Sequence, residues 1–405
     1  MRVLYCTDTY VPQVNGVSVV TDASARGLIA RGWEVEVVAP WYPAALARGA
    51  RAPGTPFGET RTGPRVHATP SFPAPRYPEL RVAIPAPWRM ARIVRAFAPD
   101  LVHCATEFAI GRVGLWAARR RGIPVVTSYH TNFGQYARAY GLGGLRSSVE
   151  RYIASVHRAA RRTYTPSTAA RAELWRMGVS DVEVWGRGVD LALFSPDQRS
   201  GQVRAQLGVN NAFTFVYVGR LAPEKSVDIV LRAFARLTET VGRDVVRLVV
   251  AGSGPEEIAL RERAPRGTVF IGTLDRCREL PALYASADAF VFASETETLG
   301  LVVLEAMASG LPVIAVPGGG VADHLRDGEN GIATPPRDVE AMAQAMHRLA
   351  TTAGMRERLS DGALRTARAL GWDAEIDRLD ASYRGLCEEV NTVRNLPVRL
   401  GLRRA

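Results

Sequence analysis

Lysine, cysteine and long apolar runs are all scarce in this sequence, and each scarcity excludes a class of protein. Of 51 basic residues only one, Lys225, is lysine. The four cysteines are far apart, with no Cys-x-x-Cys pair, so neither a disulfide framework nor a zinc site is expected. No apolar run is long enough to span a bilayer, and the first residues lack the pattern of a signal peptide. The sequence therefore predicts a cytoplasmic protein.

The composition is that of an ordinary globular protein with a basic surface. The 405 residues exceed what one hydrophobic core usually supports, so we expect two domains. A formal net charge of +11 suits nucleic acid, anionic lipid or phosphorylated substrates, although a general bias towards arginine would also produce it. Against that bias Lys225 stands out, because a compact ammonium and a planar guanidinium are not interchangeable in a tight phosphate site.

The first half of the chain alternates strand-like and helical patterns, for example the predicted helices Val17–Arg31 and Phe108–Arg121. Such alternation predicts a parallel sheet with helices on both faces. The stretch from Pro40 to Pro87 is rich in proline and glycine and predicts long loops with one strand pair. The predicted strands are Val3–Cys6, Val35–Ala39, Leu101–Cys104, Pro124–Ser128 and Val182–Trp185.

A second alternating block begins at Phe213, so the fold class is α/β with two Rossmann-like domains in series. The loops at the carboxyl ends of the strands should face a deep cleft between the domains, where such folds bind ligands. The predicted strands are Phe213–Val218, Arg247–Ala251, Val269–Ile271, Ala289–Phe292 and Val313–Val316. The predicted segments are a domain over 1–190, a linker over 191–211, a domain over 212–372, a helix over 373–390 and a basic tail over 391–405.

The strongest motif is SETETLGLVVLEAMASGLP at 294–312, which follows an apolar strand. Glu297 precedes a helix that starts near Gly300, and Glu305 lies inside it among apolar residues. A buried carboxylate needs hydrogen-bond partners, which ribose or sugar hydroxyls would provide, and a helix N-terminus offers free N–H groups to an anionic ligand. The alternative is a helix with solvated glutamates.

The second motif is VGRLAPEKS at 218–226, between a strand and a helix. It places the cations Arg220 and Lys225 on one strand-to-helix turn. A diphosphate needs such charge, above all when it departs as a leaving group. The alternative is a pair of ordinary surface cations.

These two motifs, at this separation, resemble those of the retaining GT-B glycosyltransferases of family 4, and the resemblance covers nearly the whole chain. Glu297 and Glu305 match the family's E-x7-E pattern, and Arg220 and Lys225 match its diphosphate motif. Further matches are the glycine loop at 12–17, His130 within SYHTNF at 128–133, GVD at 188–190 and GSGP at 252–255.

The resemblance implies a role for each matching position. The first domain would bind the acceptor, the second would bind the nucleotide sugar, and the helix over 373–390 would cross back to the first. The implied catalytic residues are His130, Arg220, Lys225 and Glu297. The implied donor-binding residues are Gly16, Arg220, Lys225, Glu297, Thr298, Leu299, Gly300, Leu301 and Glu305, with Glu305 on the ribose. The implied acceptor-binding residues are Tyr10, Asn15, Phe133 and Tyr136.

The family implies neither metal nor cofactor, since the nucleotide sugar is the substrate. The Thr298-Leu299-Gly300 variant of the motif resembles that of subgroups acting on lipid-linked acceptors, including mannosyl- and sulfoquinovosyl-transferases. The implied activity is transfer of a hexose, with mannose from GDP-mannose as first choice, to a lipid or glycolipid. The alternatives are a UDP-sugar donor carrying glucose, N-acetylglucosamine or sulfoquinovose, a small soluble acceptor, and a non-catalytic nucleotide-sugar binder.

Other classes fit the residues less well. A dinucleotide oxidoreductase needs Gly-x-Gly-x-x-Gly after the first strand, but residues 7–18 contain one glycine. An epimerase or phosphorylase of the same shape would not explain both motifs together. No nucleic-acid-binding motif is present.

One predicted helix is compatible with a membrane as partner. In the predicted helix Leu145–Arg162, apolar and arginine side chains fall on opposite faces, as in helices that rest on anionic lipid at the inner face of a membrane. An ordinary domain helix with a solvated arginine face is the alternative. The apolar face holds Val149, Tyr152, Ile153 and Val156, and the basic face holds Arg151, Arg158 and Arg162.

Overall fold

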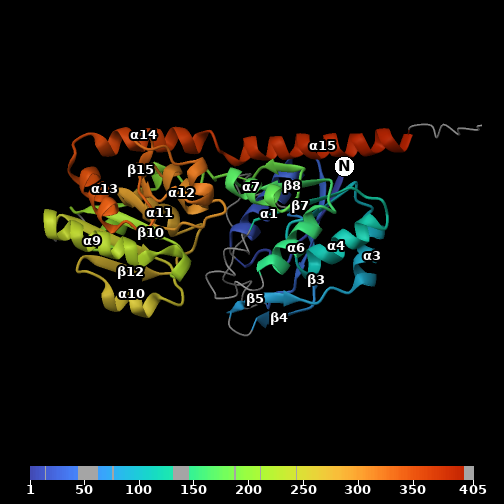
Figure 1. The fold of residues 1–405 in the computed structure, drawn as a ribbon, viewed down its shortest axis with the longest axis horizontal. Coiled ribbons are helices and arrows are strands. Elements are labelled where there is room, and N and C mark those ends of the chain that lie inside the picture. The colour runs from blue at the N-terminus through green and yellow to red at the C-terminus, as the bar shows by residue number, and fades with distance from the viewer. Residues whose placement is uncertain are drawn as a thin grey trace, which may run out of the picture.

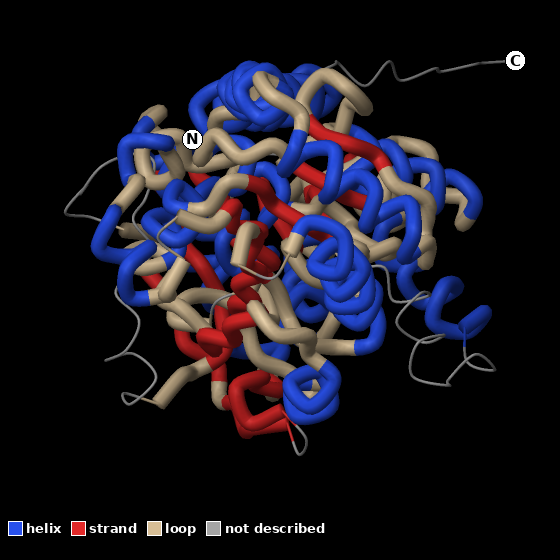
Figure 2. The backbone as a smooth tube through the Cα atoms, turned by 90° about the vertical axis from the view of Figure 1, so that its left-hand side faces the viewer, coloured by secondary structure: helices blue, strands red, loops and turns tan. Residues whose placement is uncertain are grey.

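The computed structural model describes residues 1–13, 15–43, 63–74, 77–130, 146–186, 188–209, 211–242 and 244–395. Figure 1 shows two lobes side by side, one holding the N-terminal elements and the other those from β10 to α14. Each lobe is built on its own parallel sheet. In Figure 2 most strands run through the interior with helices outside them, and a few strands lie at the lower edge.

The N-terminal sheet has seven parallel strands in the order β3-β2-β1-β6-β7-β8-β9. Its central strands are apolar and buried, as expected for a sheet covered on both faces. The strands are β1 (Arg2–Cys6), β2 (Glu34–Pro40), β3 (Arg65–Thr69), β6 (Leu101–Cys104), β7 (Val125–Ser128), β8 (Arg162–Thr165) and β9 (Val182–Val184).

The prediction of one strand pair between Pro40 and Pro87 is confirmed by β4 (Ser71–Ala74) and β5 (Tyr77–Ala83), which pair antiparallel. The same stretch also contains β3, which joins the main sheet and was not predicted. The sequence pattern missed it because prolines and glycines surround it.

Two groups of helices cover the N-terminal sheet. One face carries α1 (Gly16–Ala30) and α15 (Trp372–Asn395), whose apolar residues share a core cluster. The other carries α3 (Pro87–Phe97), α4 (Ala109–Arg119) and α6 (Arg146–His157), which share a second cluster. A further helix, α7 (Thr168–Arg176), packs against α6. None of the helices in the ranges given above is long and apolar enough to cross a bilayer.

The helix predicted over Leu145–Arg162 is wrong at its end. α6 stops at His157, and Arg162 begins β8, where it pairs with Asp181 and Glu183. Of the three predicted arginines only Arg151 therefore lies in α6, and Arg158 is exposed in the turn that follows it.

The C-terminal sheet has six parallel strands in the order β12-β11-β10-β13-β14-β15. Its strands are β10 (Phe213–Val218), β11 (Val246–Ala251), β12 (Thr268–Gly272), β13 (Ala289–Phe292), β14 (Val313–Ala315) and β15 (Gly331–Ala333). Its helices are α9 (Val227–Val241), α10 (Glu257–Arg263), α11 (Leu280–Ser286), α12 (Leu301–Ala308), α13 (Val339–Thr351) and α14 (Met355–Arg368), with short 3-10 turns η3 (Pro223–Lys225) and η4 (Gly319–Asp323).

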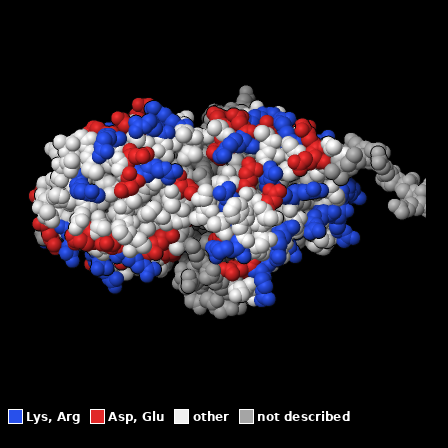
Figure 3. Space-filling model, turned by 45° about the horizontal axis from the view of Figure 1, so that its top comes forward, with Lys and Arg blue, Asp and Glu red and all other residues white. Residues whose placement is uncertain are grey.

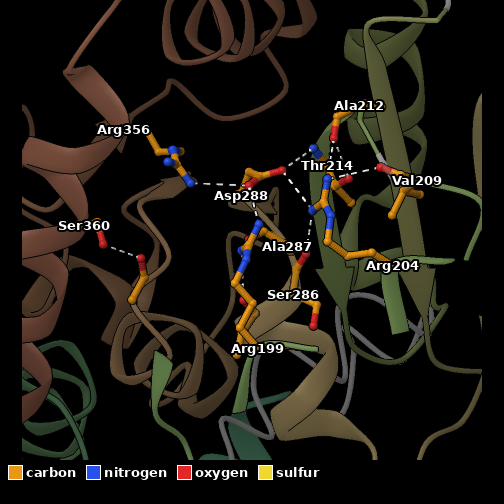
Figure 4. Close-up of polar contacts among 12 residues, drawn as sticks. Arg199, Arg204, Val209, Ala212, Thr214, Ser286, Ala287, Asp288, Arg356 and Ser360 are labelled. Carbon is orange, nitrogen blue, oxygen red and sulfur yellow. Dashed lines mark hydrogen bonds and ion pairs between the residues drawn. The ribbon is translucent and has the colours of Figure 1, made fainter. Parts of the chain in front are cut away.

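The segment expected to be a linker, 191–211, packs onto the C-terminal domain. It forms η2 (Pro196–Gln198) and α8 (Gly201–Gln206). Arg199 and Arg204 donate to carbonyl oxygens at the end of α11 and to the carboxylate of Asp288, as Figure 4 shows. Asp288 also accepts from the backbone N–H of Thr214 at 2.9 Å. These contacts fix the segment to its domain.

The chain crosses between the domains a second time after α14. The two crossings are hydrogen-bonded to each other, with Val189 N donating to Leu370 O at 2.9 Å and Trp372 N donating to Val189 O at 3.3 Å. From Trp372 onward α15 lies along the N-terminal domain (Figure 1). Its Asp380 accepts from the indole N–H of Trp33 at 2.6 Å.

Candidate active site

The loops that carry the motifs at 218–226 and 294–312 meet at the carboxyl edge of the C-terminal sheet. They follow β10 and β13, which are adjacent although they are not consecutive in the chain. A parallel sheet leaves a crevice at such a switch point, because the connections from the two strands leave in opposite directions. There the ammonium of Lys225 forms an ion pair with the carboxylate of Glu297. Both side chains are largely buried, at 15% and 14% exposed, so the pair is well shielded from water.

Arg220 lies on the same turn and is also paired. Its guanidinium binds the carboxylate of Glu224, which follows four residues later in η3 and is 5% exposed. Glu224 Oε2 is buried without a partner among the described residues. Glu224 was not among the predicted site residues, although its place between Arg220 and Lys225 in the motif at 218–226 is the signal that could have revealed it. Each candidate phosphate-binding cation therefore has a carboxylate as neighbour.

Glu305 is 2% exposed on α12, as its apolar surroundings suggested. Its Oε1 accepts from Arg276 Nε at 2.9 Å and from Arg276 Nη2 at 2.6 Å. Burial raises the pKa of Glu305, and Arg276 opposes that shift. Arg276 therefore already supplies the partner that a buried carboxylate needs, and the ribose role stays a prediction. No motif marks Arg276, which lies in the loop after β12.

The loop that carries Glu297 is supported from behind by a glycine-rich turn. A Cβ on Gly319 would lie 2.0 Å from the carbonyl oxygen of Glu297, and one on Gly320 would lie 2.5 Å from that of Thr298. Only glycine permits this approach, and Gly319 also has φ of +56°. The backbone from Glu297 to Leu301 is thereby held at the start of α12, whose N-cap is Gly300.

Two residues predicted to bind the acceptor have partners within the N-terminal domain, and their acceptor role stays a prediction. Tyr10 is buried in the core, where its hydroxyl donates to Asp22 Oδ1 at 2.8 Å. Asn15 is the N-cap of α1, accepting from Ser18 N at 2.9 Å and donating to Thr9 Oγ1 at 2.7 Å. Both side chains have structural partners, which the resemblance could not indicate.

Gly16 begins α1 and is exposed. A Cβ there would meet no atom within 4 Å, so internal packing does not require glycine at this position. The open space is compatible with close approach of a ligand to the backbone.

His130 follows β7 at the carboxyl edge of the N-terminal sheet. Burial, and to a smaller extent the neighbouring His157, lowers its pKa to about 4, so its imidazole is neutral at physiological pH. His157 in turn lies 3.4 Å from the buried carboxylate of Glu107. The predicted acceptor residues Phe133 and Tyr136 lie outside the described residues.

Asp323 and Thr168 form a contact between the two domains. The carboxylate of Asp323 in η4 accepts from the backbone N–H of Thr168 at 2.8 Å and from its hydroxyl. Thr168 is the first residue of α7, so the carboxylate also faces the positive end of that helix dipole.

Among the described residues, no group of three or more histidine, cysteine or carboxylate side chains is arranged to hold a metal ion. The site does bring together two cations, Arg220 and Lys225, and two carboxylates, Glu224 and Glu297, at the switch point of the sheet. Glu297 precedes the N-terminus of α12. That set suits a ligand with a negatively charged portion and hydroxyl groups.

The fold and this edge of the sheet define a GT-B glycosyltransferase. Residues 14–193 match the family model described as Glycosyltransferase Family 4, and residues 212–352 match Glycosyl transferases group 1. The chain belongs to glycosyltransferase family 4. It is 35% identical to the GDP-mannose-dependent alpha-mannosyltransferase of Mycobacterium tuberculosis, over 95% of this chain and 96% of that one.

Other relatives carry different names. The sulfoquinovosyl transferase SQD2 of Arabidopsis thaliana is 33% identical over 78% of this chain and 62% of its own length. Among solved structures, HepE of Anabaena in complex with UDP superposes with a TM-score of 0.75 at 19% identity, over 95% of this chain and all of that one. Sucrose-phosphate synthase of Thermosynechococcus elongatus gives 0.74 at 20% identity, over 96% and 99%. These structural likenesses show the fold.

Proposed function

We propose that this glycosyltransferase moves mannose from GDP-mannose to a lipid or glycolipid acceptor, with retention of anomeric configuration. The observation that carries the proposal is the Lys225–Glu297 pair at the β10–β13 switch point, in a chain 35% identical over nearly its full length to a GDP-mannose-dependent enzyme. The pair combines a phosphate-binding cation with a hydroxyl-binding carboxylate.

The proposed roles follow from these contacts. Arg220 and Lys225 neutralise the diphosphate as it leaves, the step at which charge develops and at which fixed cations stabilise the transition state most. The carboxylates that now pair with these cations hold them in place until the donor arrives. Glu297 then accepts from donor-sugar hydroxyls, and the backbone of Thr298, Leu299, Gly300 and Leu301 completes that subsite.

Three further residues, Glu305, Gly16 and His130, have proposed roles around the donor. Glu305, held by Arg276, orients the ribose, and Gly16 admits the diphosphate to the N-terminal domain. His130 lies beside the reacting centre as a neutral imidazole, which hydrogen-bonds the sugar without adding positive charge. The reaction as proposed uses no metal ion, and the protein works in the cytoplasm.

A UDP-sugar is the second candidate donor. It is favoured by the 33% identity to a sulfoquinovosyl transferase and by the fold shared with a UDP-bound enzyme. A non-catalytic nucleotide-sugar binder is the remaining alternative.

A donor panel tests the proposal. Purified protein is incubated with GDP-mannose, UDP-glucose, UDP-N-acetylglucosamine or UDP-sulfoquinovose, with and without lipid extract, and release of nucleoside diphosphate is followed. We expect lipid-dependent release of GDP from GDP-mannose and an α-linked mannolipid product. Lipid-dependent release of UDP alone would replace the donor assignment, and tight binding of a donor that is never consumed would favour the binder.

A further inference from the structure

The helices α3 and α4 present an unusually basic outer face. Neither helix contains an acidic residue, and α4 runs on into two more arginines. The exposed arginines of the two helices and this extension are Arg92, Arg95, Arg112, Arg119, Arg120 and Arg121. In Figure 3 basic side chains gather at the right-hand end of the molecule, the end at which α3 and α4 lie in Figure 1.

The acidic residues nearest in sequence do not neutralise this face. Between residues 84 and 121 only Asp100 and Glu107 are acidic. Asp100 accepts from the backbone N–H of Arg2 at 2.8 Å, and Glu107 is buried opposite His157. The positive charge of α3 and α4 therefore remains available to an external partner.

Two tryptophans stand among these arginines. Trp88, in the first turn of α3, is 78% exposed, and Trp116 on α4 is 41% exposed. The guanidinium of Arg120 lies 5.2 Å from the centre of the Trp116 ring. Such exposure is costly for a large apolar ring in water, so a surface that accepts both rings would be favourable.

Beside Trp116 runs a groove of about 820 Å³ between α3, α4 and α6. Its apolar lining includes Pro87, Val113, Leu115 and Ala159, and Arg112, Arg119 and Arg120 also line it. A groove lined by apolar and basic side chains suits a partner that is apolar inside and anionic at its surface.

We propose that this α3–α4 face docks on an anionic lipid bilayer. The arginines contact lipid phosphates, Trp88 and Trp116 sit at the headgroup level, where tryptophan is enriched, and the groove takes acyl chain. A nucleic acid would satisfy the charges but leave the groove empty. The face adjoins the outward side of α6, on which the sequence had placed the membrane contact, because the groove is also lined by the exposed Ser155 of α6.

The position of α4 links this face to the candidate site. Its first N–H groups are capped by Asp8 from the loop after β1, with Ile110 N donating to Oδ1 at 2.8 Å. α4 thus starts at the carboxyl edge of the N-terminal sheet, the edge that carries Gly16 and His130. The inference concerns the partner and stands whichever sugar is transferred.

The test measures binding of the full-length protein to vesicles by flotation, without any donor. The vesicles are phosphatidylcholine alone or phosphatidylcholine with phosphatidylglycerol. We expect binding only when phosphatidylglycerol is present. The quadruple variant R92Q/R95Q/R119Q/R120Q should lower the partition constant about tenfold or more, since each arginine contributes separately. Trp88→Ser should also weaken binding.

Matched controls carry the same changes elsewhere. R232Q/R348Q/R365Q/R368Q removes four exposed arginines from the C-terminal domain, and Trp175→Ser removes a 52% exposed tryptophan from α7. Both should bind like the unaltered protein, and thermal melts should show all variants folded. If both quadruple arginine variants lost vesicle binding equally, net charge alone would explain the loss, and the proposal would be overturned. Binding independent of phosphatidylglycerol, or no binding, would also overturn it.

Discussion

The two domains build their halves of the candidate site in different ways. In the C-terminal domain the pairs Arg220–Glu224 and Lys225–Glu297 come from strand-to-helix turns on two adjacent strands. In the N-terminal domain the strands behind His130 depend on the far end of the chain, since His103 on β6 is hydrogen-bonded to Tyr383 of α15. The C-terminal half of the candidate site is therefore built within its own domain, whereas the N-terminal half also depends on α15 at the end of the chain.

The largest effect on activity should come from the C-terminal half of the site. Lys225→Ala removes the cation that Glu297 binds and that we assign to the diphosphate, so turnover should fall by about 10²–10³. The measurement is kcat for nucleoside diphosphate release with saturating donor. Lys225→Arg should also be impaired, because the site is shaped for a point charge. A Lys225→Ala enzyme with nearly normal turnover, and an unchanged melting temperature, would remove the role of this residue.

A second prediction tests whether the buried Arg276–Glu305 pair stabilises the C-terminal half. Arg276→Leu leaves the Glu305 carboxylate buried and unpaired, which should lower the free energy of unfolding by about 3–5 kcal/mol. Denaturant unfolding measures this loss. The double variant Arg276→Leu/Glu305→Gln should recover part of it, since no buried charge remains. Equal stability of the single and double variants would show that the pair does not support this half.

A third effect belongs to the N-terminal half and depends on pH. Burial lowers the pKa of His103 to about 3, and its ring nitrogens contact the hydroxyls of Tyr383 and Ser128. An unfolded histidine binds a proton near pH 6.5, whereas the folded one does not, so stability is lost as pH falls from about 6.5 towards 3.

Exchanging the imidazole isolates this contribution. Between pH 7 and 5 the unaltered protein should lose about 2 kcal/mol more stability than His103→Gln, because the amide does not titrate. Unfolding curves at the two pH values measure the difference. Parallel losses in both proteins would mean that the core beneath α15 does not hold a neutral histidine.

The smallest effect should come from the contact that joins the halves. Asp323→Asn weakens its bonds to Thr168, and because Thr168 is exposed and Asp323 is only half-buried the change should cost about 0.5–1.5 kcal/mol of interdomain contact. We expect a change of a few-fold in KM, at an unchanged melting temperature. A loss as large as that of Lys225→Ala would place Asp323 in the donor site rather than between the domains.

What could be predicted from the sequence follows the same division. The central strands and the residues Lys225 and Glu297 were predictable because motif and strand lie together in the chain. Arg276 was not, since nothing near it in sequence marks it as the partner of Glu305. The hydrogen bond of Tyr10 to Asp22 on α1 and the capping of α1 by Asn15 were not predictable either, because the resemblance indicated only an acceptor role for these two residues. Arg162 was assigned to a helix because three preceding turns were amphipathic, but its carboxylate partners on and beside β9 draw it into the sheet.

The return of α15 has a consequence for synthesis. A ribosome makes residues 1–190 first and then the whole C-terminal domain before it makes this helix. Until then Trp33, Leu28 and Tyr5 lack the helix that buries them in the folded protein. Apolar surface of the N-terminal domain therefore stays exposed, and accessible to chaperones, while the C-terminal domain is made and folds. Its core closes only when residues 372–395 have left the exit tunnel.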